Sequence, residues 1–399
     1  MTPFPLALDG IRVVDLSRVI AGPWCGALLG DFGADVIKVE DTGSGDESRT
    51  WPPYRDGEGA AYLLFNRNKR SMTLDLKAPE GAEIVKALVK NADVVVENFR
   101  TGTMESFGLG YDALAAINPR LIYCSVSAFG RTGPRKDNPG YEALLQAFSG
   151  IMSITGEPNG PPVRSAVSFL DLTTGILCTL GICAAIMQRE RTGLGQRVDG
   201  SLLETAVSLL AYHAEGYLLA GVVPKPLGSA HPSLSPYRTF KCKDGQWVFV
   251  AAANDRFWQK LTRALGKEWL STDPRFAKNQ QRVAHRTELE AMLEEIFGGY
   301  ERDALCKLLD EADVPATPVN TVDQVMNDPQ TIERGIIQHA THARLGEIPV
   351  IGTPLKFSRM TPGVRQAAPL RGEHTDGILA DCGYSDAQIS ELREKKIIL

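Results

Sequence analysis

The sequence predicts an α/β protein in which the first half of the chain forms a Rossmann-like domain. Two observations support this class. Short β-branched runs alternate with segments of helical periodicity from the start of the chain, and the runs are apolar on both faces. Strands that are apolar on both faces and separated by helices are typical of a parallel sheet that helices cover on both sides.

The individual elements follow this alternation. Strands are predicted at residues 11–15, 34–40, 71–75, 93–97 and 121–127, and helices at residues 22–32 and 78–90. Two long apolar helices are then expected at residues 172–191 and 201–220, separated by a turn at residues 192–196 and a short strand. The longest apolar stretch, residues 176–187, is shorter than the ~20 residues that span a bilayer, so it predicts a buried helix and no membrane partner.

The pattern changes after residue 222. Residues 237–252 predict a β-hairpin that turns at Lys243-Asp244-Gly245, and charged helices are expected from there to about residue 313. We interpret this part as a second, smaller domain. The tail from residue 314 is rich in proline, which is typical of an ordered path over a surface, and a last helix is expected from Ser385.

Composition limits the function. Among 399 residues, 43 Lys and Arg stand against 48 Asp and Glu, which gives a formal net charge of −5, and 43% of the residues are hydrophobic. A chain of this length and composition can bury the core of two or three domains and is not expected to be disordered. A nucleic-acid partner is not expected, because phosphate backbones are held by clustered cations.

The seven cysteines are scattered singly and form no C-x-x-C pair, which predicts a reducing, cytoplasmic location. The first ten residues lack the features of a signal peptide. No metal is expected, because metal-binding motifs are missing and the closest histidines, His339 and His342, are expected in an exposed polar loop. Phosphate-loop, dinucleotide-binding and serine-hydrolase motifs are also missing, so no tightly bound cofactor is expected.

Two segments could bind phosphate groups. Residues 66–70 (NRNKR) form the densest basic cluster, and Arg matches phosphate oxygens, although a solvated loop is the alternative. Asn98, Phe99 and Arg100 follow a predicted strand, at the edge where open α/β sheets bind ligands. There Phe99 could stack on a flat base and Arg100 could meet a phosphate, or both could be structural.

Three further features could carry chemistry. Asp171 opens a strongly apolar helix, where an N-cap is the common role and a carboxylate nucleophile is the functional alternative. Cys25 lies at a helix start, where the helix dipole could favour a reactive thiolate, although a buried cysteine is the commoner outcome. The loop of small residues 228–232 (GSAHP) could bring backbone N–H groups close to a ligand, or it could be a linker.

A set of segments covers nearly the whole chain in a fixed order. They are residues 8–16 (LDGIRVVDL), 21–23 (AGP), 33–40 (GADVIKVE), 66–71 (NRNKRS), 97–100 (ENFR), 140–142 (GYE), 171–175 (DLTTG) and 192–196 (TGLGQ). Each is weak alone, but in order and spacing the set resembles the class III CoA-transferases, also called the CaiB/BaiF family.

The resemblance implies a large Rossmann-like domain formed by both termini, residues 1–222 and 325–399. It further implies a smaller α+β domain inserted with its linkers at residues 223–324, and an interlocked homodimer. The implied activity moves CoA from an acyl-CoA to a small carboxylic acid, with no ATP or metal. In the family, the aspartate that matches Asp171 attacks the donor thioester, and the reaction proceeds through an aspartyl anhydride and an aspartyl-CoA thioester.

The resemblance also implies the binding residues. CoA would be held near Arg70, Leu74, Lys77, Asn98, Phe99 and Arg100, and Tyr141 would line the site. The loop with Gly228, Ser229 and His231 is similar to that of members that use succinyl-CoA and dicarboxylic acids such as glutarate, hydroxymethylglutarate or itaconate. The second carboxylate of such an acid needs a cation, which Arg49 or Arg164 could supply.

Two alternatives stay open at this point. An α-methylacyl-CoA racemase shares the implied fold, but it would need a histidine base where this chain has Tyr141, and a phenol is a poor base at neutral pH. A non-catalytic acyl-CoA-binding protein would bind CoA without turnover.

Overall fold

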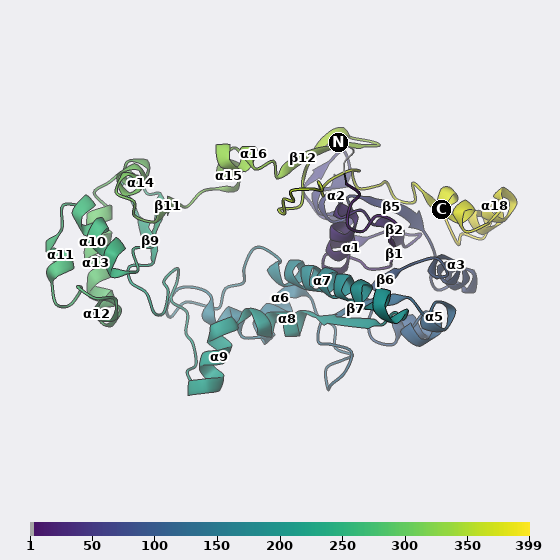
Figure 1. The fold of residues 1–399 in the computed structure, drawn as a ribbon, viewed down its shortest axis with the longest axis horizontal. Helices are drawn as coiled ribbons and strands as arrows, with labels where there is room; N and C mark the ends of the chain where they lie inside the picture. Colours follow the sequence, from purple (N-terminus) through teal and green to yellow (C-terminus); the bar gives the residue numbers. More distant parts are fainter. Residues whose placement is uncertain (1–3) are drawn as a thin grey trace. The chain divides into compact units, whose positions relative to one another are not determined.

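The computed structural model describes residues 4–399, which divide into two compact units (Figure 1). The first unit contains the chain up to Ser149, then Ser165–Ala214 and Gln330–Leu399. The second contains Gly150–Arg164 and Glu215–Pro329. The larger unit is therefore discontinuous in sequence. Residues 150–164, 215–222 and 325–329, which were expected in the large domain, group with the second unit.

A six-stranded parallel sheet forms the centre of the first unit. Its strands, in spatial order, are β5 (Lys69–Thr73), β2 (Asp35–Glu40), β1 (Arg12–Asp15), β6 (Val94–Glu97), β7 (Ile122–Ser127) and β8 (Arg197–Ser201). Numbered along the chain, this order is 3-2-1-4-5-6, so the direction of winding reverses between β1 and β6. The parallel α/β class is confirmed, and each predicted strand lies within two residues of the observed one.

Helices cover both faces of this sheet. Because successive strand side chains point to opposite faces, Val13 and Val14 enter different cores. The Val13 core is closed by α1 (Ala21–Asp31) and α7 (Phe169–Thr192). The Val14 core is closed by α3 (Pro79–Val89), α5 (Tyr111–Ile117), α17 (Thr375–Asp381) and α18 (Asp386–Glu394). The C-terminal segment therefore completes a core that the N-terminal strands begin.

Helix α7 is longer and less buried than expected. It has 24 residues and a window of mean hydropathy 1.9, so its length and composition alone would fit a membrane span, a test that core helices of soluble proteins also pass. One face packs against α1 and the sheet, but Ile176, Leu180 and Met187 are exposed. The expectation of a buried helix is therefore wrong for the face of α7 that carries these three side chains.

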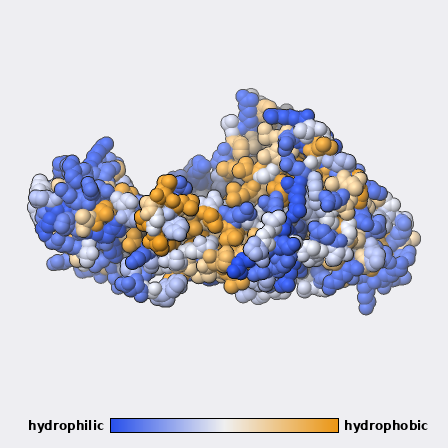
Figure 2. All heavy atoms as spheres, turned by 90° about the horizontal axis from the view of Figure 1, so that it is seen from below, coloured by the Kyte–Doolittle hydropathy of each residue, from blue (hydrophilic) through white to orange (hydrophobic). Residues whose placement is uncertain are grey.

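The expected helix at residues 201–220 is two helices, α8 (Leu202–Leu209) and α9 (Ala211–Ala220). The break coincides with Ala211, whose φ is 46° and therefore not helical. No residue of α9 is buried, and Leu218 and Leu219 are 74% and 79% exposed. Figure 2 shows apolar side chains gathered on the face of the molecule that carries α9.

The second unit has its own core. The predicted hairpin is confirmed as β9 (Arg238–Lys241) and β10 (Trp247–Val250), and β11 (Ala316–Pro318) adds an antiparallel strand that was not predicted. The helices of this unit are α10 (Asp255–Ala264), α11 (Trp269–Thr272), α12 (Asn279–Ala284), α13 (Arg286–Phe297) and α14 (Arg302–Glu311). They enclose Trp258, Phe276 and Phe297, which are fully buried.

Short elements complete the chain. They are η1 (Glu47–Thr50), β3 (Tyr54–Arg55), β4 (Glu58–Gly59), α2 (Ala60–Phe65), α4 (Thr103–Ser106), α6 (Glu142–Phe148), η2 (Ile151–Ile154), α15 (Val322–Met326) and α16 (Pro329–Glu333). In the tail, β12 (Ile337–His342) and β13 (Gly346–Ile351) form a hairpin. The exposed loop expected for His339 and His342 is therefore wrong, because both lie on β12 and His342 is buried.

Several ion pairs are buried around the sheet. Lys69 contacts Asp15 at 2.8 Å, and Arg67 contacts Asp31 at 2.6 Å, with all four side chains fully buried. Both expectations for residues 66–70, a phosphate site or a solvated loop, are therefore wrong for Arg67 and Lys69. Their charges are compensated inside the protein.

Arg67→Ala should lower the free energy of unfolding by about 3–5 kcal/mol, because the buried Asp31 carboxylate loses its guanidinium partner. The matched control is Arg393→Ala, which breaks an exposed pair with Asp376 and should cost less than about 1 kcal/mol. Urea unfolding followed by circular dichroism measures both losses. Equal losses would contradict a structural role for the buried pair.

Candidate active site

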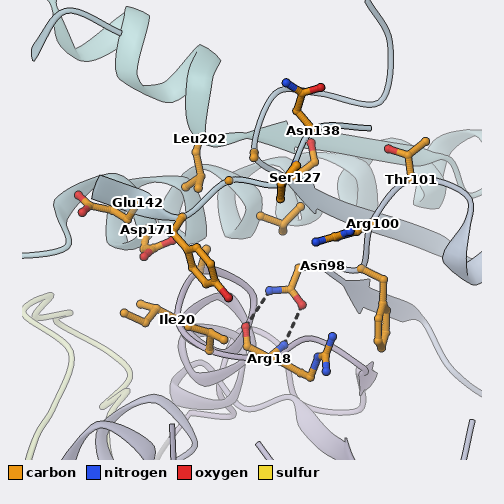
Figure 3. Close-up of a pocket in the computed structure, with 18 of the residues that line it drawn as sticks. Arg18, Ile20, Asn98, Arg100, Thr101, Ser127, Asn138, Glu142, Asp171 and Leu202 are labelled. Atoms are coloured by element: carbon orange, nitrogen blue, oxygen red, sulfur yellow. Dashed lines mark hydrogen bonds between the residues drawn. The ribbon is translucent and has the colours of Figure 1, made fainter. Parts of the chain in front are cut away.

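A pocket of about 410 Å³ lies at the carboxyl edge of the sheet in the first unit. Its walls are the segments after β1 (18–21) and β6 (98–101), the end of β7 (126–128), the loop 136–142, Asp171 of α7 and Leu202 of α8 (Figure 3). Since the winding reverses between β1 and β6, the pocket lies where open α/β sheets bind ligands.

Asp171 is the third residue of α7, whose N-cap is Ser168. The expectation that Asp171 is the N-cap is therefore wrong. Gly175, one turn further along, allows α7 to approach α1, since a Cβ at this position would lie 2.7 Å from the Ala21 carbonyl oxygen. This close approach sets Asp171 against the segment that follows β1.

The Asp171 carboxylate is partly buried, and no hydrogen bond or ion pair to it is found within residues 4–399. Burial, and then the negative charge of Glu142, raise the pKa of Asp171 to about 7. Glu142 is buried at the start of α6 and accepts a hydrogen bond from Gln146 Nε2 at 2.6 Å. A carboxylate with free oxygens in such a setting is suited to nucleophilic attack or proton transfer.

Cationic side chains also line the pocket. Arg18, Arg100 and Lys136 form no ion pair within the part of the chain that the structure describes. The Arg18 guanidinium lies over the Phe99 ring, 4.9 Å from its centroid. Unpaired cations in one pocket suit a ligand with several negative charges.

Arg131 also lines the pocket, but its guanidinium is occupied. It donates to Glu97 Oε1 at 2.6 Å, to Ser125 Oγ at 2.7 Å and to the Phe99 carbonyl oxygen at 2.8 Å. These bonds connect the ends of β6 and β7 and hold the backbone that carries Asn98 and Phe99.

The segments after β1 and β6 are joined by Asn98. Its side-chain oxygen accepts from the Arg18 N–H at 2.8 Å, and its Nδ2 donates to the Arg18 carbonyl oxygen at 2.7 Å (Figure 3). The next residue, Val19, has a φ of 76°, a left-handed conformation that costs an L-residue about 1–2 kcal/mol. The pocket wall therefore contains a strained residue beside a tightly held one.

The pocket brings together one group of the residues expected from the sequence. Asn98, Phe99, Arg100, Tyr141 and Asp171 all line it, and Figure 3 shows Asp171 beside Glu142. Cys25 does not line it and is fully buried in the core. The expected alternative of a buried structural cysteine is thereby confirmed.

Other expected residues lie outside this pocket. Arg70 on β5 pairs with Asp35 at 2.7 Å, Leu74 is buried in the core, and Lys77 is exposed just before α3. The Arg49 guanidinium makes two bonds to Glu40, each 2.8 Å long. Arg49 is therefore already occupied within the first unit.

The remaining expected residues, Arg164, Gly228, Ser229 and His231, belong to the second unit. There the Gly228 N–H donates to the Gly156 carbonyl oxygen at 2.8 Å, and Ser229 Oγ lies 2.7 Å from Thr239 Oγ1. Arg164 is exposed and forms no ion pair within residues 4–399.

Sequence reasoning missed Arg18, Lys136, Arg131 and the role of Glu142. Glu142 was visible only as part of the GYE segment, whereas Arg18 and Lys136 stand in no motif. In the part of the chain that the structure describes, no three His, Cys, Asp or Glu side chains converge as metal ligands would.

Comparisons with known proteins agree with this geometry. A family model described as CoA-transferase family III matches residues 8–375. The chain is 41% identical to the succinate–glutarate CoA-transferase of Agrobacterium fabrum, over 94% of this chain and 95% of that protein. It is 38% identical to the human succinyl-CoA:glutarate CoA-transferase, over 98% and 90%. The crystal structure of a CaiB/BaiF family protein from Brucella suis superposes with a TM-score of 0.86 at 42% identity, covering 95% of this chain and all of that one.

Asp171→Asn should make the fold more stable than that of the wild type, and the difference should grow as the pH rises. The folded-state pKa of Asp171, about 7, lies above the usual 3.8, so its stabilising contribution is complete below about pH 4 and is lost as the carboxylate ionises near pH 7. Asparagine stays neutral throughout. We expect the variant to melt several degrees above the wild type at about pH 8 and the gap to shrink toward pH 5, measured by scanning calorimetry. A gap that does not change with pH would contradict the raised pKa.

Proposed function

Because the chain belongs to CoA-transferase family III, we propose that it transfers CoA from succinyl-CoA to a small dicarboxylic acid such as glutarate, itaconate or hydroxymethylglutarate. The observation that carries this proposal is the Asp171 carboxylate, which lies free in a pocket that also presents unpaired cations. The named activities of relatives that match nearly the whole chain support the choice of donor and acceptor.

In the proposed reaction, the Asp171 carboxylate attacks the thioester carbonyl of succinyl-CoA. The C–S bond breaks, CoA leaves as a thiolate, and a mixed anhydride forms. The thiolate then attacks the Asp171 carbonyl carbon, which releases succinate and leaves Asp171 as a CoA thioester. The acceptor carboxylate attacks the carbonyl carbon of this thioester, the C–S bond breaks, CoA leaves again as a thiolate, and a second anhydride forms. The thiolate then attacks the acceptor's carbonyl carbon, which gives the new acyl-CoA and restores the Asp171 carboxylate.

The setting of Asp171 suits this chemistry. A partly buried carboxylate without hydrogen-bond donors is poorly stabilised in its charged form, so its oxygens are more reactive toward a carbonyl carbon. One thioester is exchanged for another, so the overall step needs no ATP. Reaction through Tyr141 as a racemase base has no comparable support, because that side chain is exposed.

The cations of the pocket would hold the CoA phosphates. Arg100, Arg18 and Lys136 form no ion pair within residues 4–399. Phosphate groups could therefore bind them without displacing a carboxylate of the protein. Phe99, under the Arg18 guanidinium, presents an aromatic face near these groups. Of the two cations expected for the second carboxylate of the acceptor acid, Arg49 is occupied by Glu40, and Arg164 is exposed in the second unit.

We further propose an interlocked homodimer in the cytoplasm. The exposed apolar side chains of α7 and the absence of any buried residue in α9 support a partner chain over these helices (Figure 2). The cysteines of the described chain are all free, which suits a reducing compartment.

A panel of acids tests the substrate class. With succinyl-CoA as donor, we expect kcat/KM for glutarate to exceed that for pentanoate, its monocarboxylate analogue, by at least about tenfold, because a second carboxylate gains an ion pair. Mass spectrometry of the CoA esters measures both rates. Equal rates would rule out recognition of a dicarboxylate, and no transfer to any acid would favour a binding protein.

Asp171→Ala should lower kcat at least about 1,000-fold, because the covalent path is lost. In the wild type, hydroxylamine added with succinyl-CoA should leave a hydroxamate at residue 171, identified by peptide mass spectrometry. Asp386→Asn, which changes an aspartate in the first turn of α18 away from the pocket, is the matched control and should keep full activity. Transfer that survives in Asp171→Ala would refute the nucleophile.

A further inference from the structure

Val19 is a strained residue in the wall of the pocket. It follows β1 and lines the pocket together with Arg18, Ile20 and Ala21. Its φ of 76° is rare for any residue with a side chain and most unfavourable for a β-branched one. Such a conformation persists only where surrounding contacts enforce it.

Asp46 supplies one of these contacts. Its Oδ1 accepts from the Val19 N–H at 3.2 Å, although Asp46 itself does not line the pocket. Its Oδ2 accepts from Lys38 Nζ at 2.7 Å, and both side chains of this pair are fully buried. Lys38 also donates to the carbonyl oxygen of Ser17, two residues before Val19. The carboxylate is therefore anchored to β2 and reaches the strained residue from there.

A second set of bonds fixes Asp46. The Ser48 N–H and Ser48 Oγ donate to its Oδ1 at 2.9 and 2.8 Å, and its own N–H donates to Glu40 at 3.1 Å. The Asn98 amide holds both backbone groups of Arg18, the residue before Val19. The Arg18–Val19 peptide is thus held at its carbonyl oxygen by Asn98 and at its N–H by Asp46.

We propose that Asp46 is a positioning residue, which keeps Val19 in its left-handed conformation and so holds Arg18 and Ile20 where the CoA ester meets them. Without Asp46, Val19 would relax to a negative φ, and the peptide planes on both sides of it would rotate. Affinity for CoA and the rate of transfer would then fall together, because the wall of the pocket changes shape.

The test combines removal of Asp46 with relief of the strain. Lys38→Met with Asp46→Leu removes the acceptor without leaving a lone buried charge, and this pair of changes should weaken CoA binding and kcat/KM for succinyl-CoA by about 10- to 100-fold. Adding Val19→Gly should restore both quantities by about tenfold, because glycine adopts a positive φ without penalty. In the wild-type background, Val19→Gly should raise neither quantity.

Lys86→Met with Glu83→Leu is the matched control, since it removes an ion pair on α3 away from the pocket and should change CoA affinity less than about twofold. If the combined variant fails to fold, Asp46→Asn replaces it; a neutral amide oxygen is a weaker acceptor than a carboxylate, so the glycine rescue should be smaller but of the same sign. Folding is checked by circular dichroism, and CoA binding by calorimetry.

A folded variant that glycine does not rescue would overturn the proposal, since Asp46 would then act only on general stability. This inference rests on CoA being the ligand of the pocket. If wild-type protein binds CoA but transfers none, the proposed function fails while the calorimetric comparison still decides the role of Asp46.

Discussion

Buried charge at the carboxyl edge of the parallel sheet is the constraint on which the first unit depends. Lys69 and Asp15 connect β5 to β1, and Lys38 and Asp46 connect β2 to the turn beyond it. Lys38 also donates to the Ser17 carbonyl oxygen in the connection between β1 and α1, and Lys69 donates to the Pro23 carbonyl oxygen in the first turn of α1. A charge in this low-dielectric region is tolerated only with its partner in place, so the strands and the connecting loop must assemble together.

The basic residues at this edge of the sheet fall into two groups with different functions. Lys38 and Lys69 are paired with buried carboxylates and stabilise the structure, whereas Arg100 and Lys136 line the pocket and form no ion pair with any residue that the structure describes. The net charge of −5 indicates neither the buried, paired cations nor those that line the pocket. Counting basic residues in a sequence therefore overlooks which of them a ligand can reach.

The sheet and the position of the site were predictable because they depend on local periodicity and on winding rules. The roles of residues 66–70 were not, because Arg67 and Lys69 find their partners 36 and 54 residues away in sequence. Asp171 was placed at a helix start correctly, but the helix begins at Phe169, and no local signal marked that first turn. The β12–β13 hairpin was missed because the prolines of the tail, Pro349 among them, argue against strands, although proline is tolerated on the edge strands that make up a two-stranded ribbon.

The placement of α17 and α18 has a consequence for biosynthesis. Ile378, Leu379, Ile389 and Leu392 complete the core on one face of a sheet whose first strand is residues 12–15. During translation that face stays open until residues 375–394 emerge from the ribosome. The second unit, whose segments end at Pro329, can close earlier. The nascent chain therefore carries an unfinished apolar surface, which favours aggregation, until its last two helices are synthesised.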